Sequence, residues 1–245
     1  LDFTKRAYLL SYSTVLFGGA KNNQISITSS DKSSQGIVVI SANEKSKITY
    51  TSFTNLNTLV ENEWQLTGAV TFYESDVDMT GVTIAENHCE DALNIIRSNF
   101  NIQHLNINTT YGDGFDCDFC KGKLYDSRLF NTGNDALDFS GSVISVENIV
   151  LEKIGDKGIS GGEQSTITAI NVSIKGAIIG LASKDLSLIK AENLALVNCK
   201  DGLAAYRKKP EFGGGKIKII SFSQSEVKRL ITKDEESTII LPKEN

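Results

Sequence analysis

Proline, methionine and long apolar runs are scarce in this sequence of 245 residues. It contains two Pro, one Met and no apolar stretch near the roughly 18 residues that a membrane-spanning helix requires. It also begins, at Leu1-Asp2-Phe3, without a basic-then-apolar leader. We therefore expect no membrane insertion, and we expect the sequence to be a mature form or part of a longer chain with flanking domains.

An excess of basic residues is missing as well. The 25 Lys and Arg are set against 30 Asp and Glu, a net charge of −5, which gives no electrostatic reason to expect a nucleic-acid partner. Four Cys are too few to show whether the protein is in an oxidising or a reducing compartment. The single CxxC pair, Cys117 and Cys120, does not indicate a zinc site, because there is no second pair and the two His lie at other positions of the repeat described below. The 40% apolar content suffices for a core, and the abundant Ile, Val, Leu, Thr, Ser and Asn are typical of short strands with polar turns.

A 22-residue repeat organises most of the chain. At steps of 22, one column contains only large apolar residues, and the column before it contains only small ones. The apolar column is Leu93, Phe115, Leu137, Ile159, Leu181 and Leu203. The small column is Ala92, Gly114, Ala136, Gly158, Gly180 and Gly202. Asp precedes the small residue in four of these six coils, as Asp91, Asp113, Asp135 and Asp201.

A second alternating run follows each of these positions by about ten residues, as in 102–107, 146–151 and 167–174, and its alternation predicts half-buried strands. Asn148, Asn171 and Asn193 recur at 23 and 22 residues, so we expect their amides to form a hydrogen-bonded ladder at one bend of successive coils. Several short strands fit into 22 residues, and the leucine framework of a leucine-rich repeat is absent. The fold class predicted is all-β, a parallel β-helix of about nine or ten coils.

We expect residues 1–245 to form a single β-helix domain. The repeats are clearest over 67–206, irregular loops interrupt them at 55–65 and 207–215, and 216–245 form a partial C-terminal coil or cap. Because a β-helix exposes an apolar cross-section at an uncovered end, this organisation indicates that more protein flanks the segment.

The repeat pattern resembles the pectin-lyase-like superfamily of right-handed parallel β-helices over essentially the whole chain. The phrases at 66–75, 90–98, 155–160 and 182–186 are similar to β-helix domains of large bacterial surface or secreted proteins, which often carry a spore-coat-kinase-like region. The resemblance implies a right-handed helix and an extracellular or cell-surface bacterial setting. It implies no particular chemistry.

A looser resemblance is to polygalacturonase-type glycoside hydrolases, whose Asn-Thr-Asp-Gly, Gly-Asp-Asp and Gly-His-Gly motifs fall on successive coils. The matching segments here are 111–114, 133–135 and 156–158, which retain Asp113 and Asp135. Asn134 replaces one Asp and the His is absent, and the x-Asp-Gly-Ile pattern is general turn chemistry in β-helices.

Strand alternation places Asp116 and Asp138 outward, with Asp113 and Asp135 at the turn that leads into the same strands. Like charges on coils about 4.8 Å apart cost roughly 3 kcal/mol per neighbour at an effective dielectric constant of 20. Three compensations are open: a Ca²⁺ ion held by these four Asp, pairing with nearby Lys or Arg, or a carboxyl with a raised pKa. The alternative is that the turn Asp accept backbone N–H bonds and the others are solvated.

The residues predicted to act on a substrate lie in or beside these columns. The catalytic candidates are Asp113, Asp135, Lys157 and Lys184, because a uronate lyase needs a basic residue near a neutralised carboxylate. The substrate-binding candidates are Trp64, Glu74, Arg97, Glu163 and Arg207. Ordinary surface charge, and for Trp64 a lid over the adjoining core, are the competing interpretations.

The sequence thus favours an extracellular domain that binds or acts on a polysaccharide or cell-surface glycan through an Asp/Lys face, as a lyase or glycoside hydrolase if it is an enzyme. The alternative is a non-catalytic structural or adhesive module of a larger protein. We also expect four free thiols. Cys89 and Cys199 lie five coils apart, and Cys120 lies about 10 Å from Cys117 on an extended strand unless the chain turns sharply.

Overall fold

The computed structural model describes residues 1–61 and 64–243. Residues 62–63 of the predicted loop 55–65 and residues 244–245 of the predicted cap lie outside this range. All the named elements in the described part of the chain are β-strands, and no helix there is long and apolar enough to cross a membrane.

The first large sheet, which we call the ten-stranded sheet, contributes one strand to each coil. In spatial order it contains β1 (Leu9–Ser11), β4 (Ile37–Ile40), β9 (Gly68–Tyr73), β12 (Asp91–Ile96), β15 (Asp113–Asp118), β17 (Leu137–Ser140), β19 (Lys157–Gly162), β21 (Ile179–Lys184), β23 (Asp201–Tyr206) and β26 (Arg229–Lys233).

The fifteen-stranded sheet forms the rest of each coil. Its main path is β2 (Leu16–Gly18), β5 (Ser46–Thr49), β10 (Val77–Thr80), β13 (Asn99–Gln103), β16 (Lys121–Thr132), β18 (Val143–Ile154), β20 (Thr166–Lys175), β22 (Leu188–Val197), β24 (Lys216–Ile219) and β27 (Thr238–Ile240). The strands beside this path are β3 (Ile25–Thr28), β6 (Thr51–Thr54), β11 (Thr83–Ala85), β14 (Asn106–Asn108) and β25 (Phe222–Ser225). A separate antiparallel hairpin joins β7 (Val60–Glu61) to β8 (Trp64–Gln65).

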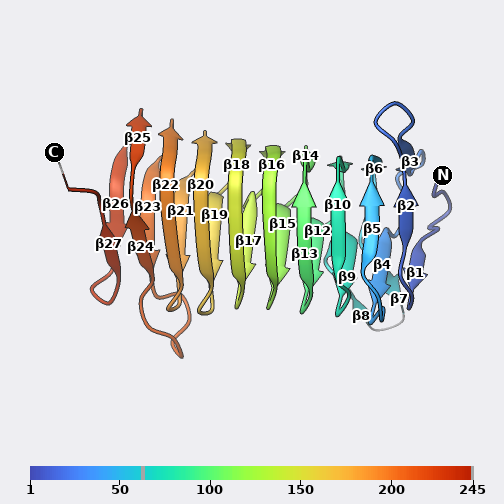
Figure 1. The fold of residues 1–245 in the computed structure, drawn as a ribbon, viewed down its shortest axis with the longest axis horizontal. Helices are drawn as coiled ribbons and strands as arrows, with labels where there is room; N and C mark the ends of the chain where they lie inside the picture. Colours follow the sequence, from blue (N-terminus) through green and yellow to red (C-terminus); the bar gives the residue numbers. More distant parts are fainter. Residues whose placement is uncertain (62–63, 244–245) are drawn as a thin grey trace.

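Neighbouring strands in both large sheets are parallel, and their order follows the chain from one end of the molecule to the other. Figure 1 shows the resulting stack of coils, with the two termini at opposite ends of the long axis. The fold is therefore a parallel β-helix of about nine turns, as the repeat predicts.

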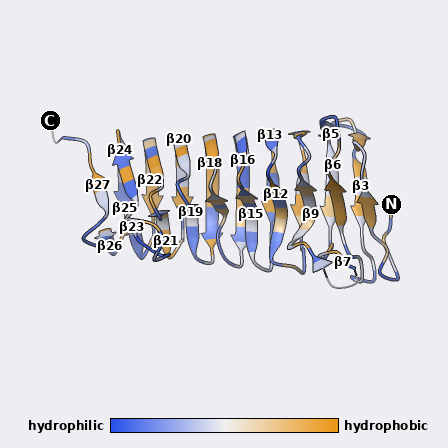
Figure 2. Cartoon of the chain, turned by 90° about the horizontal axis from the view of Figure 1, so that it is seen from below, coloured by the Kyte–Doolittle hydropathy of each residue, from blue (hydrophilic) through white to orange (hydrophobic). Residues whose placement is uncertain are grey.

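The predicted register is confirmed. Leu93 pairs with Phe115, Phe115 with Leu137, and the column continues to Leu203 with every member fully buried. Hydrophobic and hydrophilic residues alternate in short segments along the strands (Figure 2), because successive side chains point into and out of the coil. The apolar interior runs through the coils as one cluster from Val15 to Ile219.

The bends between strands are also repeated from coil to coil. Asp126, Asn148, Asn171 and Asn193 all have φ between 50° and 55°, in the left-handed region that Asn and Asp tolerate. Asn193 donates to Asn171 Oδ1 (2.8 Å), Asn171 to Asn148 Oδ1 (3.0 Å) and Asn148 to Asp126 Oδ1 (2.8 Å). The predicted Asn ladder is confirmed and extends one coil further, to Asp126.

The prediction of four free thiols is wrong. Cys117 and Cys120 form a disulfide with Cα atoms 6.1 Å apart, while Cys89 and Cys199 are buried and free. The register around them is as predicted, since Cys117 pairs with Phe139. The error lies in the turn: Phe119 has φ 57°, so the chain reverses between the two cysteines instead of remaining extended.

Gly180 tests the stacking of the small column. A Cβ at this position would lie 2.5 Å from the carbonyl oxygen of Gly202 and 2.6 Å from Leu196 Cδ2, and the backbone oxygen cannot move away cheaply. We expect Gly180→Val to lower the free energy of unfolding by about 1–3 kcal/mol, measured by denaturant titration. Gly18→Val is the matched control, because a Cβ at Gly18 meets nothing within 4 Å. Equal effects of the two substitutions would contradict the close approach.

Thiol titration tests the disulfide. Denatured protein without reductant should react at two thiols, Cys89 and Cys199, and at all four after reduction. In the native protein both free thiols should react slowly, because burial raises the pKa of Cys89 to about 12 and raises that of Cys199. Four thiols without reductant would show that the bridge is absent.

Candidate functional site

An acidic cluster occupies the outer surface of the ten-stranded sheet, on strands β12, β15 and β17. Phe115 and Cys117 point into the core, so Asp116 and Asp118 on the same strand point outward, where they are partly exposed. Asp116 pairs in register with Asp138 on the next strand. We call Asp91, Asp113, Asp116, Asp118, Asp135 and Asp138 the acidic face.

Asp113 and Asp135 have a structural role at the edge of this face. Asp113 Oδ1 accepts hydrogen bonds from the backbone N–H of Asp135 (2.8 Å) and from Asn134 Nδ2 (2.7 Å). Asp135 Oδ1 accepts the backbone N–H of Lys157 at 3.0 Å. Each carboxylate therefore ties its own coil to the following one, as the turn interpretation of these residues expects.

Burial raises the pKa of several carboxyl groups on the acidic face. The pKa is about 7 for Asp91 and for Asp113, where burial is the main cause and neighbouring carboxylates add to it, and about 6 for Asp135. Burial, with the charges of Asp91 and Asp118 next, raises the pKa of Asp116 well above its usual range. The pKa of Asp118 is also raised. These five carboxyl groups therefore take up protons at a higher pH than exposed Asp side chains do.

Three buried polar atoms on this face lack a hydrogen-bond partner among the described residues: Asn94 Oδ1, Ser160 Oγ and Asp138 Oδ1. Asn94 is 1% exposed and donates Nδ2 to Asp116 Oδ2 (2.8 Å) and Asp91 Oδ2 (3.3 Å), but its Oδ1 has no hydrogen-bond partner among the described residues. The hydroxyl of Ser160, in the same column, is likewise buried without one. Buried polar atoms without partners are uncommon in folded proteins.

The two predicted lysines neutralise the side of the face nearer the C-terminus. Lys157 Nζ lies 3.2 Å from Asp135 Oδ1 and also contacts Asp156, and Lys184 Nζ lies 3.6 Å from Asp138 Oδ1. Burial by itself would lower the pKa of Lys157, but the carboxylates of Asp135 and Asp156 more than offset this and raise it. Across residues 1–61 and 64–243, Asp91, Asp113, Asp116 and Asp118 take part in no salt bridge.

The structure disperses the predicted substrate-binding residues. Glu163 pairs with Lys209, Arg207 Nη1 pairs with Glu236 (2.8 Å) toward the C-terminal coil, and Glu74 accepts a bond from Ser41 at 3.3 Å. None of these three forms a hydrogen bond or ion pair with the acidic face in the part of the chain described, although the charge of Glu163, second to burial, helps to raise the pKa of Asp118.

Arg97 and Trp64 lie at the opposite end of the face, near the hairpin. Arg97 donates Nη1 to the Tyr73 hydroxyl (2.8 Å) and its guanidinium lies 5.8 Å from the centre of the Phe119 ring. Trp64 lines a pocket of about 300 Å³ whose other lining residues are Tyr12, Ile40, Leu66 and Tyr73. Sequence reasoning missed Tyr12, because its coil lies outside the clear 22-residue repeat.

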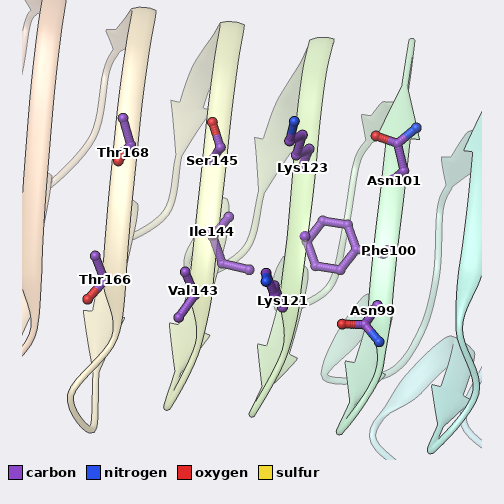
Figure 3. Close-up of a pocket in the computed structure, with 11 residues that line it drawn as sticks. Asn99, Phe100, Asn101, Lys121, Lys123, Val143, Ile144, Ser145, Thr166 and Thr168 are labelled. Atoms are coloured by element: carbon purple, nitrogen blue, oxygen red, sulfur yellow. The ribbon is translucent and has the colours of Figure 1, made fainter.

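A separate cavity of about 590 Å³ lies on the outer surface of the fifteen-stranded sheet, away from every predicted site residue. Figure 3 shows Asn101, Lys123, Ser145 and Thr168 side by side on adjacent strands along it, with Phe100 and Ile144 below. The amide, lysine and hydroxyl side chains share this open surface with apolar residues such as Val143.

No three Asp, Glu, His or Cys side chains in the described ranges are grouped so that they would hold a metal ion. The Ca²⁺ site at Asp113, Asp116, Asp135 and Asp138 stays a prediction. Hydrogen bonds to Asp113 and lysine contacts to Asp135 and Asp138 offset part of the charge, and the raised pKa of Asp116 favours its neutral form.

Comparison with known proteins identifies the fold. No protein-family model and no curated protein matches the sequence. Among solved structures, the catalytic domain of a GH87 alpha-1,3-glucanase in complex with nigerose is similar, with a TM-score of 0.50 and 11% identity over 98% of this chain. The alignment with the periplasmic alginate epimerase AlgG also covers 98% of this chain, with 11% identity and a TM-score of 0.39. The chain spans 63% of the glucanase domain and 77% of AlgG. At this identity the likeness shows the parallel β-helix alone.

The pH dependence of stability tests the raised pKa of Asp113, which is 8% exposed. Asp113→Asn keeps the Oδ1 acceptor but cannot ionise. Because the pKa of Asp113 rises from 3.8 to about 7 on folding, its contribution is complete below about pH 4 and is lost as the pH rises through 7. The free energy of unfolding of the wild type, relative to the variant, should fall by about 2–4 kcal/mol over this interval.

Asp126→Asn provides the control. Hydrogen bonds from Asn148 and Gln103 lower the pKa of Asp126, so the wild type should lose stability relative to this variant as the pH falls below about 4. Denaturant titrations between pH 3 and 8 measure both differences. A difference for Asp113→Asn that does not change with pH would contradict the assignment.

Proposed function

We propose that this chain binds an extracellular polysaccharide along the acidic face and hydrolyses its glycosidic bonds. The observation that carries the proposal is the pair Asp116 and Asp138 on adjacent strands. Partial burial and the neighbouring carboxyl groups raise the pKa of Asp116, which favours its protonated form, whereas Asp138 Oδ1 lies 3.6 Å from Lys184 Nζ. Two carboxyl groups in different protonation states are what glycoside hydrolysis requires.

In the proposed reaction, Asp116 donates its proton to the glycosidic oxygen as the bond to the anomeric carbon breaks. The Asp138 carboxylate supports the positive charge that develops on the sugar ring, either by attacking the anomeric carbon or by taking a proton from the attacking water. Asn94 holds Asp116 in place through its 2.8 Å hydrogen bond. Asp113 and Asp135 keep the two coils in register beneath the reacting groups.

Elimination by a uronate lyase is less well supported. A lyase needs a neutral base, but the two carboxylates around Lys157 raise its pKa and keep it protonated, and Lys184 faces Asp138. Asp116 and Asp118, which form no salt bridge within the described residues, also disfavour a polyanionic substrate.

Two further observations support the setting and the class of substrate. The Cys117–Cys120 disulfide is typical of proteins outside the reducing cytoplasm, which agrees with the bacterial extracellular or cell-surface location implied by the family resemblance. The similar glucanase domain, at a TM-score of 0.50, is named for a polysaccharide substrate, although one fold hosts many activities.

A non-catalytic structural or adhesive module is the second candidate. It is favoured by the ion pairs that join neighbouring coils, such as Lys157 with Asp135, Lys184 with Asp138 and Arg229 with Asp201. These pairs lie on the C-terminal side of the sheet, and the unpaired carboxyl groups lie on the other side. A purely structural role leaves those unpaired groups unexplained.

Assays on a panel of neutral and uronate polysaccharides test the proposal. We expect new reducing ends without the ultraviolet absorbance of unsaturated products, on a neutral member of the panel. Asp116→Asn and Asp138→Asn should each lower the rate by about 10²- to 10⁴-fold, because each removes one of the two carboxyl roles. The rate should also fall at alkaline pH as Asp116 loses its proton.

Asp126→Asn is the control, since Asp126 is hydrogen-bonded at a bend on the other sheet. Parallel reactions with added Ca²⁺ and with a chelator examine the predicted calcium site. Glycan binding without product release would favour the adhesive module, and unsaturated products would favour a lyase.

A further inference from the structure

We propose that the pocket formed by Tyr12, Trp64 and Tyr73 is a binding subsite for an uncharged sugar ring of the same glycan. This inference rests on the proposed function and deepens it, because it names the class of ligand and the end of the acidic face at which the glycan is held. We call it the aromatic subsite.

The aromatic subsite is built on a covered part of the ten-stranded sheet. Val38 on β4 and Thr71 on β9 point outward yet are fully buried, and Leu59, just before the hairpin, is fully buried outside the core cluster. The segment that leads into the β7–β8 hairpin therefore supplies apolar contacts at this end of the sheet. The hairpin carries Trp64 into the same pocket as Tyr12 and Tyr73.

The lining of the pocket suits a neutral sugar. Its five residues, Tyr12, Ile40, Trp64, Leu66 and Tyr73, are all uncharged, and three are aromatic. Tyr12 is 66% exposed and Trp64 is 37% exposed, so both rings are accessible. Aromatic faces pack against the C–H groups of a pyranose ring, and the volume of about 300 Å³ lies at the lower end of the roughly 300–1,000 Å³ range of ligand pockets.

A hydrogen-bonding group lies beside the aromatic faces. The hydroxyl of Tyr73 accepts a hydrogen bond from Arg97 Nη1 at 2.8 Å, and this arginine also stacks over Phe119. The bond leaves the Tyr73 O–H free to donate to a sugar hydroxyl. Arg97 thus positions Tyr73. It also lies between the subsite and the disulfide turn, which contains Phe119 and follows Asp118.

The register connects the subsite to the acidic face. Tyr73 pairs with Ile96 on β12, and Ile96 pairs with Asp118 on β15. Two strand spacings, roughly 9–10 Å in total, therefore separate the backbone of Tyr73 from that of Asp118. A glycan that lies across the strands, parallel to the helix axis, would contact both the aromatic subsite and the acidic face.

Trp64 is the single tryptophan of the chain, so its fluorescence reports on this pocket alone. The probes are uncharged gluco-hexasaccharides with α-1,3, α-1,4 or β-1,3 linkages, and a hexagalacturonate serves as the charged counterpart. We expect a saturable change in emission with a neutral probe and none with the galacturonate. Tyr12→Ala should weaken the fluorescence-detected binding about tenfold through the loss of one stacking face.

Binding to Trp64→Ala and Trp64→Phe is measured by calorimetry. Trp64→Ala should bind about tenfold more weakly, and Trp64→Phe, which keeps an aromatic face, should recover most of the affinity. Tyr111→Ala is the matched control, because Tyr111 is 75% exposed and does not line this pocket. Thermal midpoints identify any variant that fails to fold. If Trp64→Ala is unfolded, Tyr12→Ala and Trp64→Phe provide the test.

The outcomes separate the two proposals. If a probe binds the wild type without changing its emission, and Trp64→Ala and Tyr12→Ala bind it normally, the aromatic subsite is wrong. Product release that still depends on Asp116 would in that case leave the proposed function intact. Tight binding of hexagalacturonate at Trp64 would overturn the assignment to uncharged sugars, and failure of the wild type to bind or cleave any panel glycan would overturn both proposals.

Discussion

Parallel stacking in strict register is the constraint on which the rest of this structure depends. Each outward or inward position repeats about 4.8 Å away on the next coil, so in the regular coils a strand residue has the residue 22 or 23 positions later as a direct neighbour. Identical neighbours are favourable for apolar side chains, which fill a continuous core, and for Asn, whose amide donates and accepts at once. They are unfavourable for carboxylates, and the Asp columns are where this structure needs compensation.

The compensation differs along the sheet, and the candidate chemistry follows from that difference. Asp135 and Asp138 have lysine partners, whereas burial and the neighbouring carboxyl groups raise the pKa of Asp116. A fold that required only neutralised charge would be expected to pair the whole column. The same stacking that brings like charges together places the proposed acid, Asp116, beside the proposed base, Asp138.

The two ends of the face are shaped by departures from the repeat. At one end the β7–β8 hairpin and the irregular first coil place Trp64 and Tyr12 in one pocket. At the other end the loop 207–215 contacts the residues that directly follow β19 and β21: Lys209 pairs with Glu163, and the backbone N–H of Lys209 donates to Asp185 Oδ1 (2.9 Å). The regular coils thus supply the row of carboxyl groups, and the irregular segments make its two ends different, with an aromatic pocket at one end and charged pairs at the other.

The 22-residue columns alone predicted the parallel β-helix, the buried Leu93 column, the outward direction of Asp116 and Asp138 and the Asn ladder, because a regular repeat determines which residues become neighbours. The same columns contained a signal for the disulfide that was overlooked: Phe119 stands one coil before Gly141, and both adopt positive φ. Only the tertiary structure decided which carboxyl groups have lysine partners, since long side chains such as Lys184 reach past Gly162 to another strand. Only the tertiary structure, too, placed Tyr12 and Trp64 in the lining of one pocket. Neither residue lies in the repeat, so their proximity depends on how two irregular segments fold back onto the sheet.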